Sequence, residues 1–257
     1  MCYDVRASLE AQLIRAYRRN DSRAYEEIKA KLEPYVDLPL YHVSGYQHPS
    51  MLIYTFDSPN VPIVAKWGLI PFWVKDQEQA KKLWNQTLNA RGESIFEKPS
   101  FRDSAKNKRC LIYVDGFFEH HHFRSNTYPY YIHLKNNKPI ALAGLWSEWT
   151  DEATGEILNT FSIVTTEGND MMAKIHNNPK LEGPRMPLIL PEEFTDKWLI
   201  PVKDDLDRKA VLELIQSYPQ EELDAYTVHK LRGKEYLGNV ENINEKVSYP
   251  ELASELI

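Results

Sequence analysis

The sequence predicts an α+β fold whose core is a curved, mostly antiparallel sheet or β-barrel with helices at its periphery. Two observations favour this class. Many short apolar runs are separated by turn signals, as in antiparallel sheets and barrels. Helical periodicity occurs at the start of the chain and between the strand-like runs, which is typical of α+β domains. At 257 residues with 42% hydrophobic content, one domain covering residues 1–257 is expected.

The expected elements follow in chain order. Apolar residues at helical spacing predict two short helices over residues 9–17 and 25–32, separated by Asn20-Asp21. Strand-like runs occupy residues 51–56, 61–67, 109–114, 130–134, 140–146, 161–166 and 186–190. Further helices are expected over residues 76–88, 168–176, 192–199 and 205–217. From about residue 220 the chain is polar without a clear period, and we interpret it as an irregular appendage.

Charge and cysteine content narrow the function classes. The net charge is −6, but residues 66–109 carry +5 and the other residues together −11. A basic segment with aromatic residues nearby is typical of a nucleic-acid site, although a solvated charged face has the same composition. The two cysteines, Cys2 and Cys110, provide no disulfide framework, and we expect neither a secretory signal nor a membrane span.

Cys2 is a candidate nucleophile because of its place in the chain. If Met1 is removed, Cys2 carries both a free α-amine and a thiol. An aldehyde condenses with such an amine to an imine, and the thiol can then close onto the same carbon as a thiazolidine ring. Preorganisation of this second step is worth an effective molarity of about 10⁵ M or more.

Two motifs could contact nucleic acid. WGLIPFW places Trp67, Pro71 and Trp73 around a rigid turn, and exposed rings there could stack on unpaired bases. At least one of the two tryptophans is expected to belong to the core instead. In NAR, Asn89 and Arg91 point the same way if the segment is extended, which sets an amide beside a phosphate-binding guanidinium.

Two further motifs carry titratable groups. DGFFE ends at Glu119, and a carboxylate in apolar surroundings has a raised pKa suited to proton transfer, although a surface glutamate on an edge strand fits the pattern equally well. The histidines at 120–122 alternate in direction and lack metal-ligand partners, so no metal site is expected. His176 closes the helix expected over residues 168–176 and can titrate near neutrality, with Arg185 close behind.

The order of these motifs resembles the SOS response-associated peptidase (SRAP) family. The resemblance extends from Cys2 to about Leu190 and is carried by MC, WGLIPFW, NAR, RCLIYVDGFFE, ALAGLWSEW, TTE and a His before RMP. It implies a SRAP-like fold and a protein that recognises abasic sites in single-stranded DNA and crosslinks itself to them through its N-terminal cysteine. The implied catalytic residues are Cys2, Asn89, Glu119 and His176; the expected DNA-binding residues are Trp67, Pro71, Trp73, Arg91, Lys98 and Arg185.

The chain departs from the family pattern in two places within this span. Tyr3 and Asp4 follow the cysteine, where Gly and Arg are usual, so a basic contact beside the lesion is absent or supplied by Arg6. The interval between His176 and Arg185 is also longer than the short His-x-Arg-Met-Pro form. Residues beyond about 200 lie outside the resemblance.

The resemblance and the residue chemistry together lead to one mechanistic hypothesis. Glu119 or His176 transfers the protons that open the sugar, Asn89 holds the Cys2 amine, and the ring closes on the exposed aldehyde. We expect a cytoplasmic monomer, nucleoid-associated when bound to DNA, with neither cofactor nor membrane partner. Two alternatives stay open: a cysteine peptidase with Cys2 as nucleophile, which could remove Met1, and a non-covalent single-strand DNA-binding module.

Overall fold

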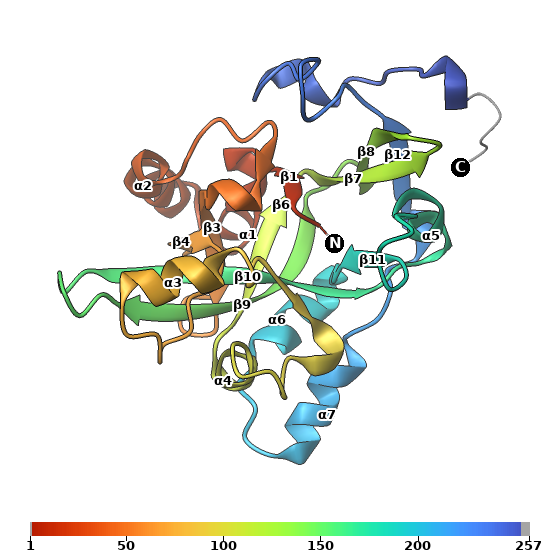
Figure 1. Ribbon diagram of the computed structural model, residues 1–257. Helices are drawn as coiled ribbons and strands as arrows, with labels where there is room; N and C mark the ends of the chain where they lie inside the picture. Colours follow the sequence, from red (N-terminus) through yellow and green to blue (C-terminus); the bar gives the residue numbers. More distant parts are fainter. Residues whose placement is uncertain (1, 253–257) are drawn as a thin grey trace.

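A closed β-barrel forms the centre of the computed structural model, which describes residues 2–252 (Figure 1). In pairing order its strands are β10 (Ile157–Glu167), β4 (Ile63–Trp67), β3 (Ser50–Thr55), β6 (Arg109–Val114) and β9 (Ile140–Thr150). The barrel closes because β9 pairs with β10 as well as with β6. Of these pairs, β10–β4 is parallel and the others are antiparallel. This mixed barrel confirms the predicted fold class.

A second, antiparallel sheet stands beside the barrel. Its order is β12 (Leu223–Thr227), β8 (Asn126–Leu134), β7 (Gly116–Phe123), β1 (Asp4–Arg6) and β2 (Val43–Ser44). Two short strands extend the far end of β10: β5 (Asn89–Arg91) pairs with it in parallel and β11 (Arg185–Pro187) pairs antiparallel. Strands β5 and β11 therefore extend the sheet of the barrel, whereas β1 belongs to the second sheet.

Strand alternation divides the apolar residues between two cores. In β6, Cys110 and Ile112 belong to the cluster inside the barrel, whereas Leu111 and Tyr113 belong to the cluster outside it. Successive side chains point to opposite faces of a strand, and β6 is apolar throughout because both of its faces are buried. Burial on both faces explains why the motif RCLIYV reads as a continuous apolar run.

Helices lie at the periphery of the sheets. They are α1 (Leu9–Arg19), α2 (Ser22–Leu32), α3 (Gln77–Trp84), α4 (Arg102–Asn107), α5 (Asp170–Ile175), α6 (Glu192–Leu199) and α7 (Asp205–Glu213). Helices α1 and α6 pack on strands of the barrel, whereas α5 packs against β7 and β11. Short 3₁₀ turns occupy Glu33–Tyr35, Gly45–Gln47, Gly92–Ser94, Gln220–Glu222, Glu241–Asn244 and Pro250–Leu252. Helix α1 begins at Ser8, whose hydroxyl accepts from the Ala11 N–H at 3.1 Å and caps the helix. The buried Arg109 donates to the carbonyls of Ala105 and Trp198, which are near the C-terminal ends of α4 and α6 and lack a partner within their helices.

The polar segment expected after residue 219 is partly regular. It contains β12, which pairs with β8 from Leu223–Leu134 to Thr227–Tyr130. Residues 228–252, which we call the C-terminal strap, then pass over the outer face of the β12–β8–β7–β1 sheet (Figure 1). Val228, Leu231 and Ile243 of the strap form a small cluster with Phe118 of β7 and Tyr131 of β8. The strap thus adds a third apolar layer to the molecule.

Most sequence-based elements coincide with the observed ones. The helices expected over residues 9–17, 25–32 and 192–199 correspond to α1, α2 and α6. The helix expected over residues 76–88 is shorter and spans Gln77–Trp84. The expected elements did not include α4, β1, β2, β5, β7 and β12, which except for β7 are two to six residues long. Within residues 2–252, no helix is long and apolar enough to cross a membrane.

Candidate functional site

The four predicted catalytic residues come together from four separate segments. Cys2 precedes β1, Asn89 begins β5, Glu119 lies in β7 and His176 ends α5. The amide nitrogen of Asn89 donates to the Cys2 carbonyl at 2.8 Å. The Glu119 Oε2 atom lies 3.9 Å from Nε2 of His176. Antiparallel pairing of Asp4 with Phe118 brings the start of β1 to Glu119, since one further step of this register sets Tyr3 opposite that residue.

The Cys2 thiol is buried and protonated. Its side chain has no exposed surface, and Sγ donates to the Asp4 carbonyl at 3.9 Å. Burial raises the pKa of the Cys2 thiol, and the nearby Glu119 carboxylate raises it further. A thiol in this state is a poor first nucleophile. It is suited to a second step in which it adds to a carbon already held beside it.

Asn89 offers an unused acceptor at the same place. Its Nδ2 atom is engaged by the Cys2 carbonyl, whereas its buried Oδ1 atom has no hydrogen-bond partner within the described part of the chain. A buried amide oxygen left unsatisfied costs about 1–3 kcal/mol, so a donor at this point would be favoured. The geometry therefore suits a nitrogen bearing protons next to the Cys2 main chain.

His176 is held in one tautomer by the backbone. Its Nδ1 atom accepts from the N–H of Arg185 at 3.0 Å, so the neutral ring carries its proton on Nε2, which faces Glu119. Burial lowers the pKa of His176 to about 4. Burial also raises the pKa of Glu119, although the His120 N–H donates to its Oε1 atom at 2.9 Å. At neutral pH this pair combines a neutral imidazole with a carboxyl group that gains a proton easily.

The three consecutive histidines have different surroundings. The His121 Nδ1 atom lies 2.9 Å from the Lys174 carbonyl, and the backbone N–H of His122 donates to Asn177 at 2.7 Å. His120 instead lies close to Asp4, whose charge acts on its pKa against the larger effect of burial. In the region spanning residues 2–252, no group of three or more His, Cys, Asp or Glu side chains could hold a metal ion.

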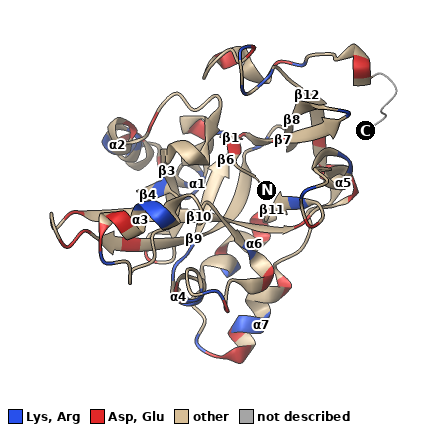
Figure 2. Cartoon of the chain, in the orientation of Figure 1, with Lys and Arg blue, Asp and Glu red and all other residues tan. Residues whose placement is uncertain are grey.

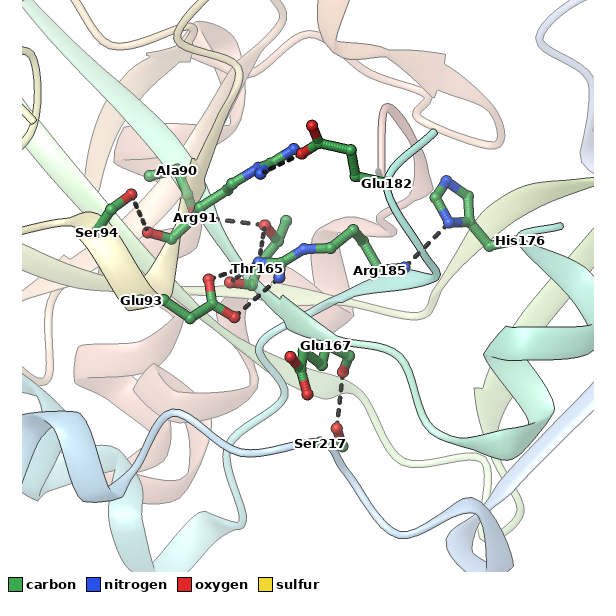
Figure 3. Close-up of polar contacts among 10 residues, drawn as sticks. All are labelled: Ala90, Arg91, Glu93, Ser94, Thr165, Glu167, His176, Glu182, Arg185 and Ser217. Atoms are coloured by element: carbon green, nitrogen blue, oxygen red, sulfur yellow. Dashed lines mark hydrogen bonds and ion pairs between the residues drawn. The ribbon is translucent and has the colours of Figure 1, made fainter. Parts of the chain in front are cut away.

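Both predicted phosphate-binding arginines face carboxylates (Figure 3). Arg185 forms a two-pronged ion pair with Glu93 at 2.8 and 2.9 Å, donates to the Thr165 carbonyl at 2.9 Å, and is only 11% exposed. Arg91 is half exposed and contacts Glu182 at 3.3 Å. Glu182 belongs to the longer interval between His176 and Arg185. Its carboxylate occupies a position on Arg91 that a phosphate could take.

The WGLIPFW segment divides between core and surface, as expected for at least one of its two tryptophans. Trp67 and Pro71 are buried, and Nε1 of Trp67 donates to the Leu88 carbonyl at 2.8 Å inside the barrel core. Gly68 makes the turn at φ +115, where an added Cβ would lie 2.3 Å from the Trp84 ring. Phe72 is 63% exposed and Trp73 is partly exposed. Because Trp67 has no exposed face, stacking by this segment would fall to Phe72 and Trp73.

Of the residues around the site, Trp73 and Lys98 were predicted from the sequence, whereas Tyr46 was not. The Trp73 indole donates to the Pro99 carbonyl at 3.4 Å, which sets it beside the exposed Lys98. Tyr3 packs against Tyr46 with ring centroids 5.1 Å apart, and Tyr46 is 49% exposed. Tyr46 sits on a 3₁₀ turn too short to show a period, so its proximity to Cys2 is visible only in the fold.

Charge near the site is mixed rather than uniformly basic. Figure 2 shows an acidic position on β1 and a basic one at β11, on either side of the N-terminus. Ion pairs neutralise part of the basic segment, including Arg91 with Glu182 and Lys82 with Glu78. The exposed members of such pairs are weakly bound and can exchange for other anions.

Comparisons with known proteins assign this arrangement to a family. Residues 1–234 match the family described as SOS response associated peptidase (SRAP). The chain is 37% identical over 195 residues to the abasic site processing protein YoqW of Bacillus subtilis, covering 74% of this chain and 81% of that protein. It is 30% identical over 185 residues to the abasic site processing protein HMCES of Xenopus tropicalis, covering 63% and 53%.

Solved structures agree with the sequence relatives. A crystal structure of a protein from Bacteroides thetaiotaomicron superposes with a TM-score of 0.82 at 34% identity, covering 96% of this chain and 100% of that one. A protein from Bordetella bronchiseptica shares the fold with a TM-score of 0.68 at 20% identity, covering 88% and 99%. With the fold, the family match and the relatives in agreement, the chain belongs to the SRAP family.

Proposed function

We propose that this protein binds single-stranded DNA at abasic sites and forms a thiazolidine crosslink between Cys2 and the ring-opened sugar. The observation that carries the proposal is the Asn89–Cys2 hydrogen bond of 2.8 Å, because it fixes the main chain of Cys2 just before β1, whose register with β7 leads to Glu119. The names of the relatives, abasic site processing proteins, support the choice of substrate.

The reaction balances with the loss of one water. After Met1 is removed, the Cys2 amine adds to the C1′ aldehyde, and the carbinolamine loses water to form an imine. The thiol sulfur then bonds to C1′, and the thiol proton moves to the former imine nitrogen. Since the thiol of Cys2 has a raised pKa, it enters as a neutral group whose proton is available for this transfer. The unsatisfied Oδ1 of Asn89 would accept a hydrogen bond from the amine and orient it.

Glu119 and His176 are assigned the proton transfers. An abasic sugar is mostly closed, so its ring oxygen must gain a proton while the C1′ hydroxyl loses one. Glu119 can do both in turn, because its raised pKa lies nearer to neutrality than that of an ordinary glutamate. The Nε2 proton of His176, fixed by the Arg185 N–H, stabilises the ionised form of Glu119 between the two transfers.

DNA contacts would come from exchangeable ion pairs and exposed rings. Arg91 and Lys98 are assigned to flanking phosphates, with the Glu182 carboxylate leaving Arg91 when DNA binds. Arg185 is assigned to a phosphate as well, shared with Glu93 because its guanidinium is almost buried. Phe72 and Trp73 provide stacking faces for splayed bases. Binding through phosphates predicts affinity that falls steeply as the salt concentration rises.

A denaturing gel tests the proposal. A labelled single-stranded oligonucleotide with one abasic site is incubated with the intact protein, with Cys2→Ala and with Cys2→Ser. The intact protein should give a heat-stable shifted band, Cys2→Ala none, and Cys2→Ser at most a labile one. Cys110→Ala is the matched control, because that thiol is buried in the barrel. An equally stable band from Cys2→Ala would refute the proposal.

The same proteins separate the peptidase alternative. The Cys2 thiol donates to the Asp4 carbonyl, whereas a peptidase would need it to donate to the His176 ring. Mass spectrometry of Glu119→Ala and His176→Ala shows whether Met1 removal depends on these residues. Met1 retained in both variants would support self-processing, and its loss in all variants would point to a general aminopeptidase.

A further inference from the structure

The N-terminal strand β1 is short, so its position depends on the elements that contact it. It spans Asp4–Arg6 and pairs with β7 over three residues and with β2 over two. Upstream of it, the Gly45 N–H donates to the Tyr3 carbonyl at 2.7 Å and Asn89 holds the Cys2 carbonyl. A chain end is ordered by what ties it down, and here β7 and β2 hold the backbone of β1. The residues that carry the reacting amine and thiol therefore depend on what packs against β1.

The C-terminal strap supplies side-chain contacts at both ends of β1. Arg232 donates to the Asp4 carboxylate at 2.9 Å. The Tyr236 hydroxyl lies 2.7 Å from Nδ1 of His42, whose Nε2 is 3.3 Å from Asp4. At the other end of the strand, Arg6 donates to Asn244 at 2.9 Å. Both ends of β1 are thus tied to residues more than 190 positions away in sequence.

The Asp4 carboxylate is the critical contact. Asp4 is 2% exposed and lies two residues from Cys2. Burial alone would favour its protonated form, but the hydrogen bond and charge of His42 and the charge of Arg232 hold the pKa of Asp4 below its ordinary range. Loss of Arg232 would leave the buried Asp4 carboxylate with His42 alone of these two partners, so its charge would be less well compensated and its position less well fixed.

We infer that Arg232 of the C-terminal strap is a positioning residue for the crosslinking reaction, acting on Cys2 through Asp4. The inference rests on the proposed function. The strap contacts the opposite face of the β1–β7 pair from Glu119, because Asp4 and Phe118 face the strap while Phe117 faces the barrel. It therefore sets the place of the Cys2 amine and thiol without touching the sugar. Tyr236 and Asn244 lie beyond the residues 1–234 that match the family.

The test compares Arg232→Gln, Arg232→Lys and the double variant Asp4→Asn/Arg232→Gln. Two quantities are measured: the crosslinking rate at saturating protein, and the dissociation constant for the same oligonucleotide without a lesion at several salt concentrations. Arg232→Gln should slow crosslinking roughly 10-fold, because a displacement of even 1 Å can cost about 100-fold. Arg232→Lys should retain most of the rate. Lys234→Gln, an exposed lysine of the strap, is the matched control.

The double variant distinguishes positioning from a phosphate contact. If Arg232 acts by compensating Asp4, removing both charges should restore the rate to within about threefold, and affinity for undamaged DNA should stay unchanged in every variant. If Arg232 instead binds a phosphate, affinity falls in the single and double variants alike, and the slope of log K against log salt falls by roughly one. That result overturns the inference.

If Arg232→Gln folds poorly, Tyr236→Phe provides a second test of the same inference. Tyr236→Phe removes only the hydroxyl on His42, and it should slow crosslinking a few-fold at unchanged DNA affinity and unchanged melting temperature within a few degrees. An unchanged rate in Tyr236→Phe and in folded Arg232→Gln contradicts the inference. Failure of the proposed function has a different signature, since the intact protein would then form no adduct at all.

Discussion

Replacing Glu119 with glutamine should separate catalysis from folding. Glutamine keeps the shape of the side chain, and its carbonyl oxygen can accept from the His120 N–H that now lies 2.9 Å from Oε1. It cannot gain or lose a proton at neutral pH. Proton transfer by a positioned side chain contributes about 10²–10⁴-fold, so crosslinking by Glu119→Gln should slow by that factor.

The same variant should be more stable than the intact protein at high pH. Burial raises the pKa of Glu119, so the folded state holds its proton more tightly than the unfolded state. Stability is then greatest at low pH and is lost as the pH rises through the folded pKa, by about 1.4 kcal/mol for each pKa unit of displacement. Glutamine has no such loss, so the stability difference should be larger at pH 8 than at pH 4.

Two measurements check this pair of effects. Single-turnover crosslinking on an abasic oligonucleotide gives the rate, and thermal unfolding at pH 4 and pH 8 gives the stability. Glu97→Gln is the control, because Glu97 is an exposed partner of Arg208. A Glu119→Gln protein that crosslinks at the normal rate, or that is destabilised equally at both pH values, would refute the assignment of Glu119 as a buried proton carrier.

Three further changes test other parts of the site. His176→Gln should reduce the loss of stability on acidification, which pH-dependent unfolding measures. Because the pKa of His176 is lowered to about 4, the unfolded chain takes up a proton between about pH 6.5 and 4 that the folded chain does not. Glu182→Gln should tighten binding of undamaged single-stranded DNA by at most about fivefold, since the exposed ion pair of Glu182 with Arg91 is worth about 1 kcal/mol or less. Weaker binding of this variant in a titration would contradict the replacement of Glu182 by a phosphate on Arg91. Tyr46→Leu should weaken DNA binding by about 1–3 kcal/mol at an unchanged saturating rate, if its ring stacks on a base beside the lesion; unaltered affinity would exclude this contact.

The fold class could be predicted because the barrel strands carry their own signal. β6 and β10 are long enough to show continuous burial, and α1 shows a clear apolar face. β12 and the strap could not be predicted in the same way. They are held by individual contacts over long sequence separations, such as Arg232 with Asp4, and a single side-chain pair leaves no period in the sequence.

The site could be predicted only as a set of residues. Asn89, Glu119 and His176 are ordinary in isolation, and it is the pairing of β5 with β10 and of β1 with β7 that brings them to Cys2. The aromatic surface illustrates the limit of motif reasoning. WGLIPFW marks the correct turn, but burial of Trp67 in the barrel leaves Phe72 as its most exposed ring, because the turn at Gly68 redirects the chain.

The central claim concerns which atoms of the protein hold the sugar, and intact-mass analysis of the purified adduct addresses it most directly. A thiazolidine requires a mass equal to that of the protein without its first methionine plus the oligonucleotide, less one water, with the modification mapped to Cys2. An adduct that retains the methionine, or one mapped to a lysine side chain, would contradict it.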